Sequence, residues 1–258
     1  ADGKIIKDRF IPEGMVGLVF NLNGSVKLYR ENENAKVLPA SFIVLSQVAP
    51  LMVEVFHPID SIIVKFKTSV LSRLYGIDLS KVQGCLFIEY DLFNGISIVE
   101  QLKSISDSVE RIQYLESYFR ASFGAKTYVP DEIDKVYNTI LNSDGRESVN
   151  NIVSGIDTNN RTFRRNFVKR TGISAKKLLR IVRINYIYEI INSKEKCGDV
   201  YTLAYLGGFF DHAHFIKDFK DILGETPKSF LARNLESVRY ISGKQDMQTI
   251  DASNLADS

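Results

Sequence analysis

The sequence predicts an α+β chain in which a β-rich N-terminal half, a small barrel or sandwich followed by helices, precedes an all-helical C-terminal half. Short β-branched and aromatic runs separated by turn residues fill the chain from residue 5 to about 90. After residue 95 the apolar spacing changes from two to three or four, and after residue 130 glycines punctuate a series of helical patterns. With 258 residues, of which 45% are hydrophobic and 25% charged, the chain has enough material for one or two domains.

Six β-rich runs are expected in the N-terminal half. Asn23 and Gly24 stand between the first two, and because both residue types tolerate positive φ, we expect a hairpin there. Closely spaced strands without helices between them favour a barrel or sandwich. One helical interruption is expected from Thr68 to Tyr75. The runs are Met15–Asn21, Val26–Arg30, Phe42–Ser46, Leu51–Phe56, Ser61–Lys67 and Leu86–Glu89.

An apolar stripe of helical spacing follows at residues 98–119. Its members step by four, three, four and three, which predicts either one helix or two helices broken near Ser106 and Asp107. The stripe has two interpretations of about equal weight: it packs against its own β domain, or it forms half of a homodimer contact. Its members are Ile98, Leu102, Ile105, Val109 and Ile112.

The rest of the chain is helical in pattern and gives the domain boundaries. Residues 1–125 are expected to form a β-rich sensor or dimerisation domain with helices at 96–120. Residues 131–240 form a second domain, and the polar residues 241–258 a disordered tail. Ser174, Asp199 and Asp211 stand at expected N-caps, and Gly172 and Gly224 at helix ends. Helices are expected near 131–142, 147–155, 160–171, 174–192, 199–206, 212–223 and 227–234.

Positive charge is concentrated in residues 158–183. The whole chain has a net charge of only +2, and residues 1–130 carry 14 basic and 14 acidic residues, whereas residues 131–240 carry 18 and 14. The stretch 158–183 has no Asp or Glu, which indicates a polyanion as partner. Its basic residues are Arg161, Arg164, Arg165, Lys169, Arg170, Lys176, Lys177, Arg180 and Arg183.

Two segments of the C-terminal half have the same internal spacing. Each has a short helix, a turn and a second helix with two Phe four residues apart, Phe163 and Phe167 or Phe215 and Phe219. In each, a Gly follows five residues after the second Phe. Duplicated helix-turn-helix units at the two ends of one long helix can enter successive major grooves about 34 Å apart.

At this point the sequence resembles a known family. Residues 208–220, GFFDHAHFIKDFK, followed by Gly224 and Thr226-Pro227, resemble the C-terminal signature of AraC-type bacterial transcription regulators. The first unit is similar to that family's first recognition helix, and the resemblance spans residues 131–235. The β-rich half resembles the cupin-like sensor half of some members, through Pro12 to Gly24 and Val64-Lys65-Phe66.

The resemblance implies a role for each matching position. The first recognition helix would face DNA with Arg161, Arg164 and Arg165, and with Asn160 beside them. The second would do so with His212, Ala213 and Lys217. Arginine donates two bonds to guanine, and a methyl group suits thymine. Phosphate contacts are expected from Lys169, Lys176, Lys177 and Lys220, whereas Phe163, Phe167, Phe215 and Phe219 are expected in the core.

The expected function is therefore that of a sequence-specific DNA-binding transcription regulator, an activator by resemblance. Double-stranded DNA is the expected partner, with RNA polymerase, a small-molecule effector and a homodimer partner as further candidates, in the cytoplasm and nucleoid. Alternatives are a metal-dependent cupin-type enzyme and a protein-interaction module. Recognisable nucleophile, phosphate-binding and zinc motifs are absent from the sequence, and His212 and His214 diverge by about 200° on a helix. We therefore expect no catalytic residues, cofactor, metal or membrane span.

Overall fold

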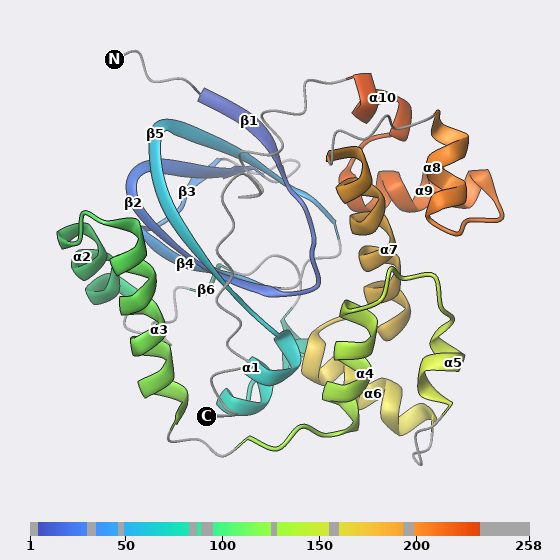
Figure 1. Ribbon diagram of the computed structural model, residues 1–258, viewed down its shortest axis with the longest axis horizontal. Helices are drawn as coiled ribbons and strands as arrows, with labels where there is room; N and C mark the ends of the chain where they lie inside the picture. The colour runs from blue at the N-terminus through green and yellow to red at the C-terminus, as the bar shows by residue number, and fades with distance from the viewer. Residues whose placement is uncertain are drawn as a thin grey trace.

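A computed structural model describes residues 5–29, 35–45, 49–82, 87–88, 95–124, 128–154, 160–192 and 199–232. Figure 1 shows a curved sheet with helices α2 and α3 on one side and the helical C-terminal part on the other. The expected α+β fold, with a β-rich N-terminal half and an all-helical C-terminal half, is confirmed. The predicted tail at 241–258 lies outside the described residues.

The sheet is antiparallel in every strand pair that the structure describes. Its order is β1-β5-β2-β4-β6, and β3 pairs with β2. The long strands β2 and β5 form its centre and pair over most of their length. The strands are β1 (Ile5–Phe10), β2 (Val16–Tyr29), β3 (Lys36–Val37), β4 (Ser41–Val44), β5 (Leu51–Phe66) and β6 (Phe87–Ile88).

The hairpin expected at Asn23 and Gly24 is wrong. Strand β2 continues through both residues, and its register with β5 shifts on either side of Asn23. Gly24 has the positive φ, 78°, that a hairpin turn would also need. However, a Cβ there would lie 2.7 Å from the carbonyl oxygens of Phe56 and Pro58, so the backbone of β5 lies directly against Gly24. A positive φ can form an irregularity within a strand as well as a turn. Because β5 continues opposite β2, four expected strands become two.

Helices α2 (Gly95–Ser104) and α3 (Ser108–Gly124) confirm the two-helix alternative for the apolar stripe. The Asp107 carboxylate accepts bonds from the amides of Val109 and Glu110, which begins α3. Ile98 and Leu102 are buried against the sheet, so this part of the stripe packs on its own β domain. Val109, by contrast, is 49% exposed. The N-terminal half also contains α1 (Thr68–Tyr75), at the bounds expected, and the 3-10 helix η1 (Leu79–Lys81).

The C-terminal helices pack around α7, which supplies nine of the buried residues. The expected N-caps at Ser174, Asp199 and Asp211 are confirmed, because each side chain accepts a bond from a first-turn amide. None of the helices that the structure describes is long and apolar enough to cross a membrane. The helices are α4 (Glu132–Leu141), α5 (Val149–Val153), α6 (Asn160–Thr171), α7 (Ala175–Asn192), α8 (Val200–Leu206), α9 (His212–Leu223) and α10 (Pro227–Ala232).

Candidate DNA-binding surface

The first helix-turn-helix unit consists of α5 and α6. Phe163 and Phe167 are 5% and 0% exposed, and their ring centroids lie 5.7 Å apart in the core, as expected. With these two residues fixing the buried side, the opposite side of α6 carries only basic residues at its exposed positions. The side chain of Asn160 lies outside the described residues. The exposed residues are Arg161, Arg164, Arg165 and Lys169.

The second unit consists of α8 and α9. Phe215 and Phe219 are fully buried, with ring centroids 5.6 Å apart. Ala213, Lys217 and Lys220 are exposed on α9, at positions where the resemblance implies DNA contacts.

His212 differs from the other α9 candidates because it packs within the protein. Its ring is half-buried and stacks on Tyr201 of α8, with centroids 4.2 Å apart and planes inclined by 16°. Its Nε2 atom is buried and has no hydrogen-bond partner in the described structure. In this orientation the imidazole faces α8, and a base contact from Nε2 would require the ring to rotate.

The turn between α8 and α9 depends on two glycines. Gly208 has a φ of 67°, which side chains with a Cβ adopt at a cost. A Cβ on Gly207 would lie 2.4 Å from Cδ1 of Ile187, so the turn packs closely against α7 and a larger residue there would require the end of the Ile187 side chain to move. The second unit is thereby held against the helix that joins it to the first.

Helix α7 sets the distance between the two units. Its 18 residues span about 27 Å at 1.5 Å per residue. Figure 1 shows it running between α6, near its start, and α8 and α9, near its end. Arg180 of α7 donates to Asp218 at 2.5 Å and to Asp221 at 2.9 Å, which attaches α9 to α7. The two candidate recognition helices therefore belong to one packed frame.

Three residues of the basic run, to which no DNA contact was assigned from the sequence, interact with other groups of the protein. Arg170 and Arg180 form ion pairs with carboxylates. Arg183 donates from Nε to the Gly145 carbonyl at 2.6 Å and lies over the Phe209 ring at 5.1 Å. Sequence composition could not separate these residues from the exposed ones, because their carboxylate and carbonyl partners lie at least 36 positions away in the chain.

The lysines expected at phosphates divide in a similar way. Lys169, Lys176 and Lys220 are exposed, whereas Lys177 is half-buried. Burial and then the nearby charge of Arg180 lower the pKa of Lys177 below its usual value. Because partial burial limits its access to solvent, Lys177 is less suited than Lys176 to a phosphate contact.

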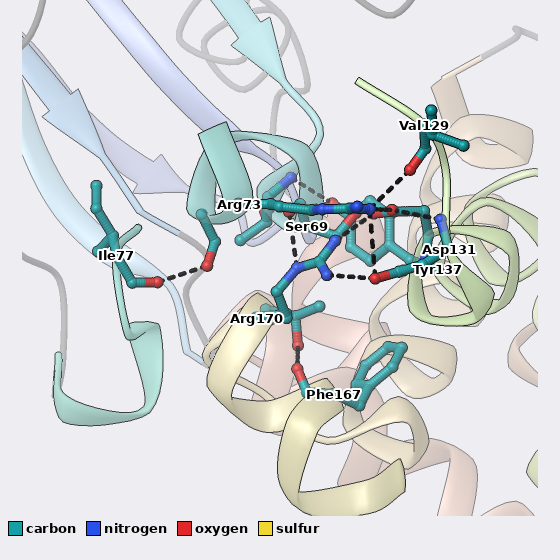
Figure 2. Close-up of polar contacts among 12 residues, drawn as sticks. Ser69, Arg73, Ile77, Val129, Asp131, Tyr137, Phe167 and Arg170 are labelled. Atoms are coloured by element: carbon teal, nitrogen blue, oxygen red, sulfur yellow. Dashed lines mark hydrogen bonds and ion pairs between the residues drawn. The ribbon is translucent and has the colours of Figure 1, made fainter. Parts of the chain in front are cut away.

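The C-terminal end of α6 is attached to the N-terminal half by an ion-pair cluster (Figure 2). Arg170 donates to Asp131 at 2.8 Å, to Asp134 at 2.7 Å and to the carbonyl of Ser69 in α1 at 3.1 Å. Arg73 of α1 lies 3.4 Å and 3.5 Å from the same two carboxylates. Asp131 and Asp134 also form a capping box at the start of α4, and neither the box nor the two arginines that these carboxylates bind were foreseen from the sequence.

The carboxylate of Asp134 is the most enclosed charge of this cluster, with 1% of its side chain exposed. Burial acts to raise its pKa, but hydrogen-bond donors, including the amide of Asp131, and the charge of Arg170 outweigh that effect. The net result is a lowered pKa, so the carboxylate stays ionised. A buried anion of this kind is stable only while its cationic partners remain in place.

Tyr137 of α4 makes a second contact between the halves. Its hydroxyl donates to the carbonyl of Gly14 at 2.6 Å and accepts from the amide of Thr68 at 3.1 Å. Complete burial is the main cause that raises the pKa of Tyr137 to about 12. At physiological pH the hydroxyl therefore stays neutral and connects α4 with α1 and with Gly14, which precedes β2.

Two further polar contacts connect the halves near the second unit. Arg9 of β1 donates to Glu225, between α9 and α10, at 2.9 Å. Asn185 of α7 donates to the carbonyl of Pro12 at 2.8 Å. Both recognition units and the connecting helix thus contact the N-terminal half. Within the part of the chain that the structure describes, no three His, Cys, Asp or Glu residues are grouped so as to hold a metal ion.

Comparisons with known proteins match this arrangement. Residues 154–233 match a family described as a helix-turn-helix domain. No curated protein sequence matches the chain. Among solved structures, a lysine-to-alanine variant of apo ToxT from Vibrio cholerae strain SCE256 is 17% identical, with 90% of this chain and 93% of that one covered and a TM-score of 0.50.

Two other ToxT structures are also similar. A 1.65 Å structure from Vibrio cholerae is 16% identical over 89% of this chain and 97% of that one, with a TM-score of 0.48. Wild-type ToxT from strain SCE256 with bound unsaturated fatty acid is 15% identical over 90% and 95%, with a TM-score of 0.46. At these identities the likeness concerns the fold.

The matched residues contain α6 to α10 and begin directly after α5, so they include both candidate recognition helices and α7 between them. The match confirms the predicted resemblance of these residues to AraC-type regulators. The β-rich half with its following helices fits the cupin-like fold expected for the N-terminal half. Residues 154–233 are thus a helix-turn-helix domain of the AraC type, and the chain is a DNA-binding transcription regulator.

Proposed function

We propose that the protein inserts α6 and α9 into successive major grooves on one face of double-stranded DNA and activates transcription there. The observation that carries this proposal is the presence of two helix-turn-helix units held by one α7 of about 27 Å. Adjacent major-groove segments on one face of DNA lie about 34 Å apart, and recognition helices at the two ends of such a helix suit that repeat.

The two recognition helices would have different tasks. Arg161, Arg164 and Arg165 form the exposed basic surface of α6, which suits guanine edges and phosphates, with Asn160 beside them. On α9, Ala213 offers a methyl group and Lys217 a single cation, and His212 would contribute after rotating away from Tyr201. Lys169, Lys176 and Lys220 would contact phosphates.

The domain division proposed from the sequence fits these roles. Residues 1–125 would be the sensor or dimerisation domain, and residues 131–240 the DNA-binding domain. A small-molecule effector in the first would reach α6 through α1, because Arg73 and Ser69 of α1 contact the Arg170 cluster. Dimerisation would use the solvent-facing remainder of the 98–119 stripe, where Val109 is exposed. The protein would act at the nucleoid in the cytoplasm, without catalysis.

The test is selection from a random duplex pool by the full-length protein at two salt concentrations. We expect one bipartite motif, with protection of two adjacent major grooves on one DNA face. Binding that is sensitive to salt but selects no sequence would contradict specific readout. Transcription from a promoter carrying the selected site should increase when the protein is added, and a decrease would contradict activation.

The methyl contact of α9 has its own test. Replacing thymine by uracil removes only the 5-methyl group in the major groove. If Ala213 touches such a methyl, uracil in the half-site of α9 should weaken binding several-fold for the native protein and hardly at all for Ala213→Gly. The matched control is uracil in the half-site of α6, where equal weakening of both proteins is expected. Equal sensitivity of both proteins in the α9 half-site would remove Ala213 from the interface.

A further inference from the structure

A short segment of the N-terminal half lies beside the first candidate recognition helix. The 3-10 helix η1 packs against α6, and a Cβ on Gly172, in the turn after α6, would lie only 3.4 Å from the carbonyl oxygen of Leu79. The side chain of Leu79 is buried and belongs to the core of the β-rich half. The segment therefore has a fixed place at the C-terminal end of α6.

The exposed basic residues of α6 lead toward η1. Arg161, Arg165 and Lys169 are spaced four residues apart, so they lie on one side of the helix. They extend over about 12 Å, from the first turn of α6 to the last. This row lies opposite the buried Phe163 and Phe167, on the side that the proposed function turns toward DNA. A phosphate near the end of the row would therefore also be near η1.

Lys81 gives this segment an exposed cation. Its side chain is 81% exposed, and its Nζ atom lies 4.0 Å from the carboxylate of Asp78, whose side chain is 23% exposed. Asp78 accepts hydrogen bonds from the amide of Ser80 at 3.1 Å and from its hydroxyl at 2.6 Å, which caps η1. The acid is thus engaged within the segment, whereas the ammonium group extends into solvent.

Asp78 also indicates that a cation of α6 lies close to η1. Its pKa is lowered below the usual value, mainly by the hydroxyl of Ser80, and the charges of Lys169 and Lys81 both contribute. Opposite charges have this effect at close range. A lysine of α6 and a lysine of η1 therefore flank the same carboxylate. Two cations around one anion leave a net positive charge at this place, which suits a phosphate.

We propose that Lys81 contacts a DNA phosphate beside the groove that α6 occupies, so that the N-terminal half forms part of the DNA-binding surface. This rests on the proposed function, because α6 must lie in the major groove for η1 to reach the adjacent backbone. In homeodomains, for example, the C-terminal end of the recognition helix contacts the backbone, and η1 lies at that end of α6. A phosphate contact positions a protein without reading a base. Lys81 therefore adds affinity for any sequence and no discrimination between sequences.

The experiment compares the full-length Lys81→Ala variant with the native protein, on operator and on random duplex DNA, at several salt concentrations. We expect Kd to rise about three- to tenfold on both DNAs, and the slope of log affinity against log salt concentration to fall by about one. Lys81→Arg keeps the charge and should restore both values. Circular dichroism and urea unfolding check that each variant folds.

The matched control is Lys103→Ala, which removes an exposed lysine from the same half of the chain. Lys103 belongs to α2, and Figure 1 shows α2 across the sheet from the C-terminal helices. This substitution should change neither the Kd nor the salt slope. An equal effect of the Lys103 and Lys81 substitutions would overturn the proposal, because it would report only the net charge of the protein.

Asp78→Asn separates a phosphate contact from a structural role of the ion pair. Asparagine can still cap η1, and loss of the carboxylate charge should strengthen binding to both DNAs if Lys81 contacts a phosphate. Weaker binding by Asp78→Asn, in parallel with Lys81→Ala, would overturn the proposal, because both substitutions break the same ion pair.

Neutral methylphosphonates placed singly around the half-site of α6 locate the contact. At one position the replacement should weaken binding by the native protein and hardly affect Lys81→Ala. At phosphates in the half-site of α9 it should weaken binding by both proteins alike. The proposal is also overturned if no position distinguishes the two proteins, or if Lys81→Ala binds DNA as the native protein does. Failure of the native protein to bind a bipartite site would instead refute the proposed function.

Discussion

Replacing Arg170 by alanine should destabilise the protein through the buried carboxylate of Asp134. The guanidinium makes three hydrogen bonds, to Asp131, Asp134 and the carbonyl of Ser69, and only 14% of its side chain is exposed. Its removal leaves the carboxylate of Asp134 enclosed and short of one cationic partner. The loss should therefore exceed that of an ordinary surface ion pair.

The magnitude follows from the degree of burial. Breaking a buried ion pair typically costs about 3 to 5 kcal/mol, whereas an exposed pair contributes about 0 to 1 kcal/mol. Asp131 is 39% exposed, and Arg73 remains near both carboxylates, so part of the charge stays compensated. We expect a decrease of about 2 to 3 kcal/mol in the free energy of unfolding.

Urea unfolding at pH 7, followed by circular dichroism and tyrosine fluorescence, measures this loss. Both probes are needed because a two-domain chain can unfold in more than one step. The matched control is Arg164→Ala, an arginine exposed on the same helix, which should change stability by no more than about 0.5 kcal/mol. Asp134→Asn in the Arg170→Ala background should recover part of the loss. Equal small effects of the Arg170 and Arg164 substitutions would refute the reasoning.

Three further predictions concern readout, the contact between halves and pH. Arg165→Ala should reduce discrimination between operator and random DNA by about 1 to 3 kcal/mol. Lys176→Ala should weaken binding to operator and to random DNA alike, and should lower the slope of log affinity against log salt concentration by about one. Titrations at several salt concentrations would measure both effects. Tyr137→Phe should cost about 1 to 3 kcal/mol in urea unfolding, because the buried amide of Thr68 loses this acceptor and the carbonyl of Gly14 loses one of its buried donors. An unchanged midpoint would count against these bonds. The pKa of Asp134 is lower in the folded protein than its unfolded value of about 3.9, so the ionised carboxylate contributes stability above that value. This stability is lost as pH falls through the lower folded-state pKa. Acid should therefore destabilise the native protein more steeply than the Asp134→Asn variant, as urea unfolding at several pH values would show.

The helical half was predictable because its signals are local. A helix begins where a side chain can cap free amides and ends where a glycine can adopt positive φ, and both conditions are visible in adjacent residues. Asp199 and Asp211 were therefore placed correctly as N-caps, and the paired Phe residues as core. The break between α2 and α3 was foreseen only as one of two alternatives.

The strands were less predictable because a strand is defined by its partner. Asn23 and Gly24 permit a hairpin, but they equally permit the irregularity seen in β2. Which of the two forms depends on β5, some thirty residues away, which continues along β2 on both sides of Gly24. Local sequence contains no information on that pairing.

By itself, the sequence determined the order of the two halves, the duplicated helix-turn-helix units and the excess of positive charge on the first. Only the tertiary structure decided which of those charges face outward. Arg170, Arg180 and Arg183 read like their neighbours in the sequence, yet each has its partner inside the protein. The reason is physical: composition and spacing report what a helix surface carries, whereas the pairing of a charge depends on chain segments brought close only by folding.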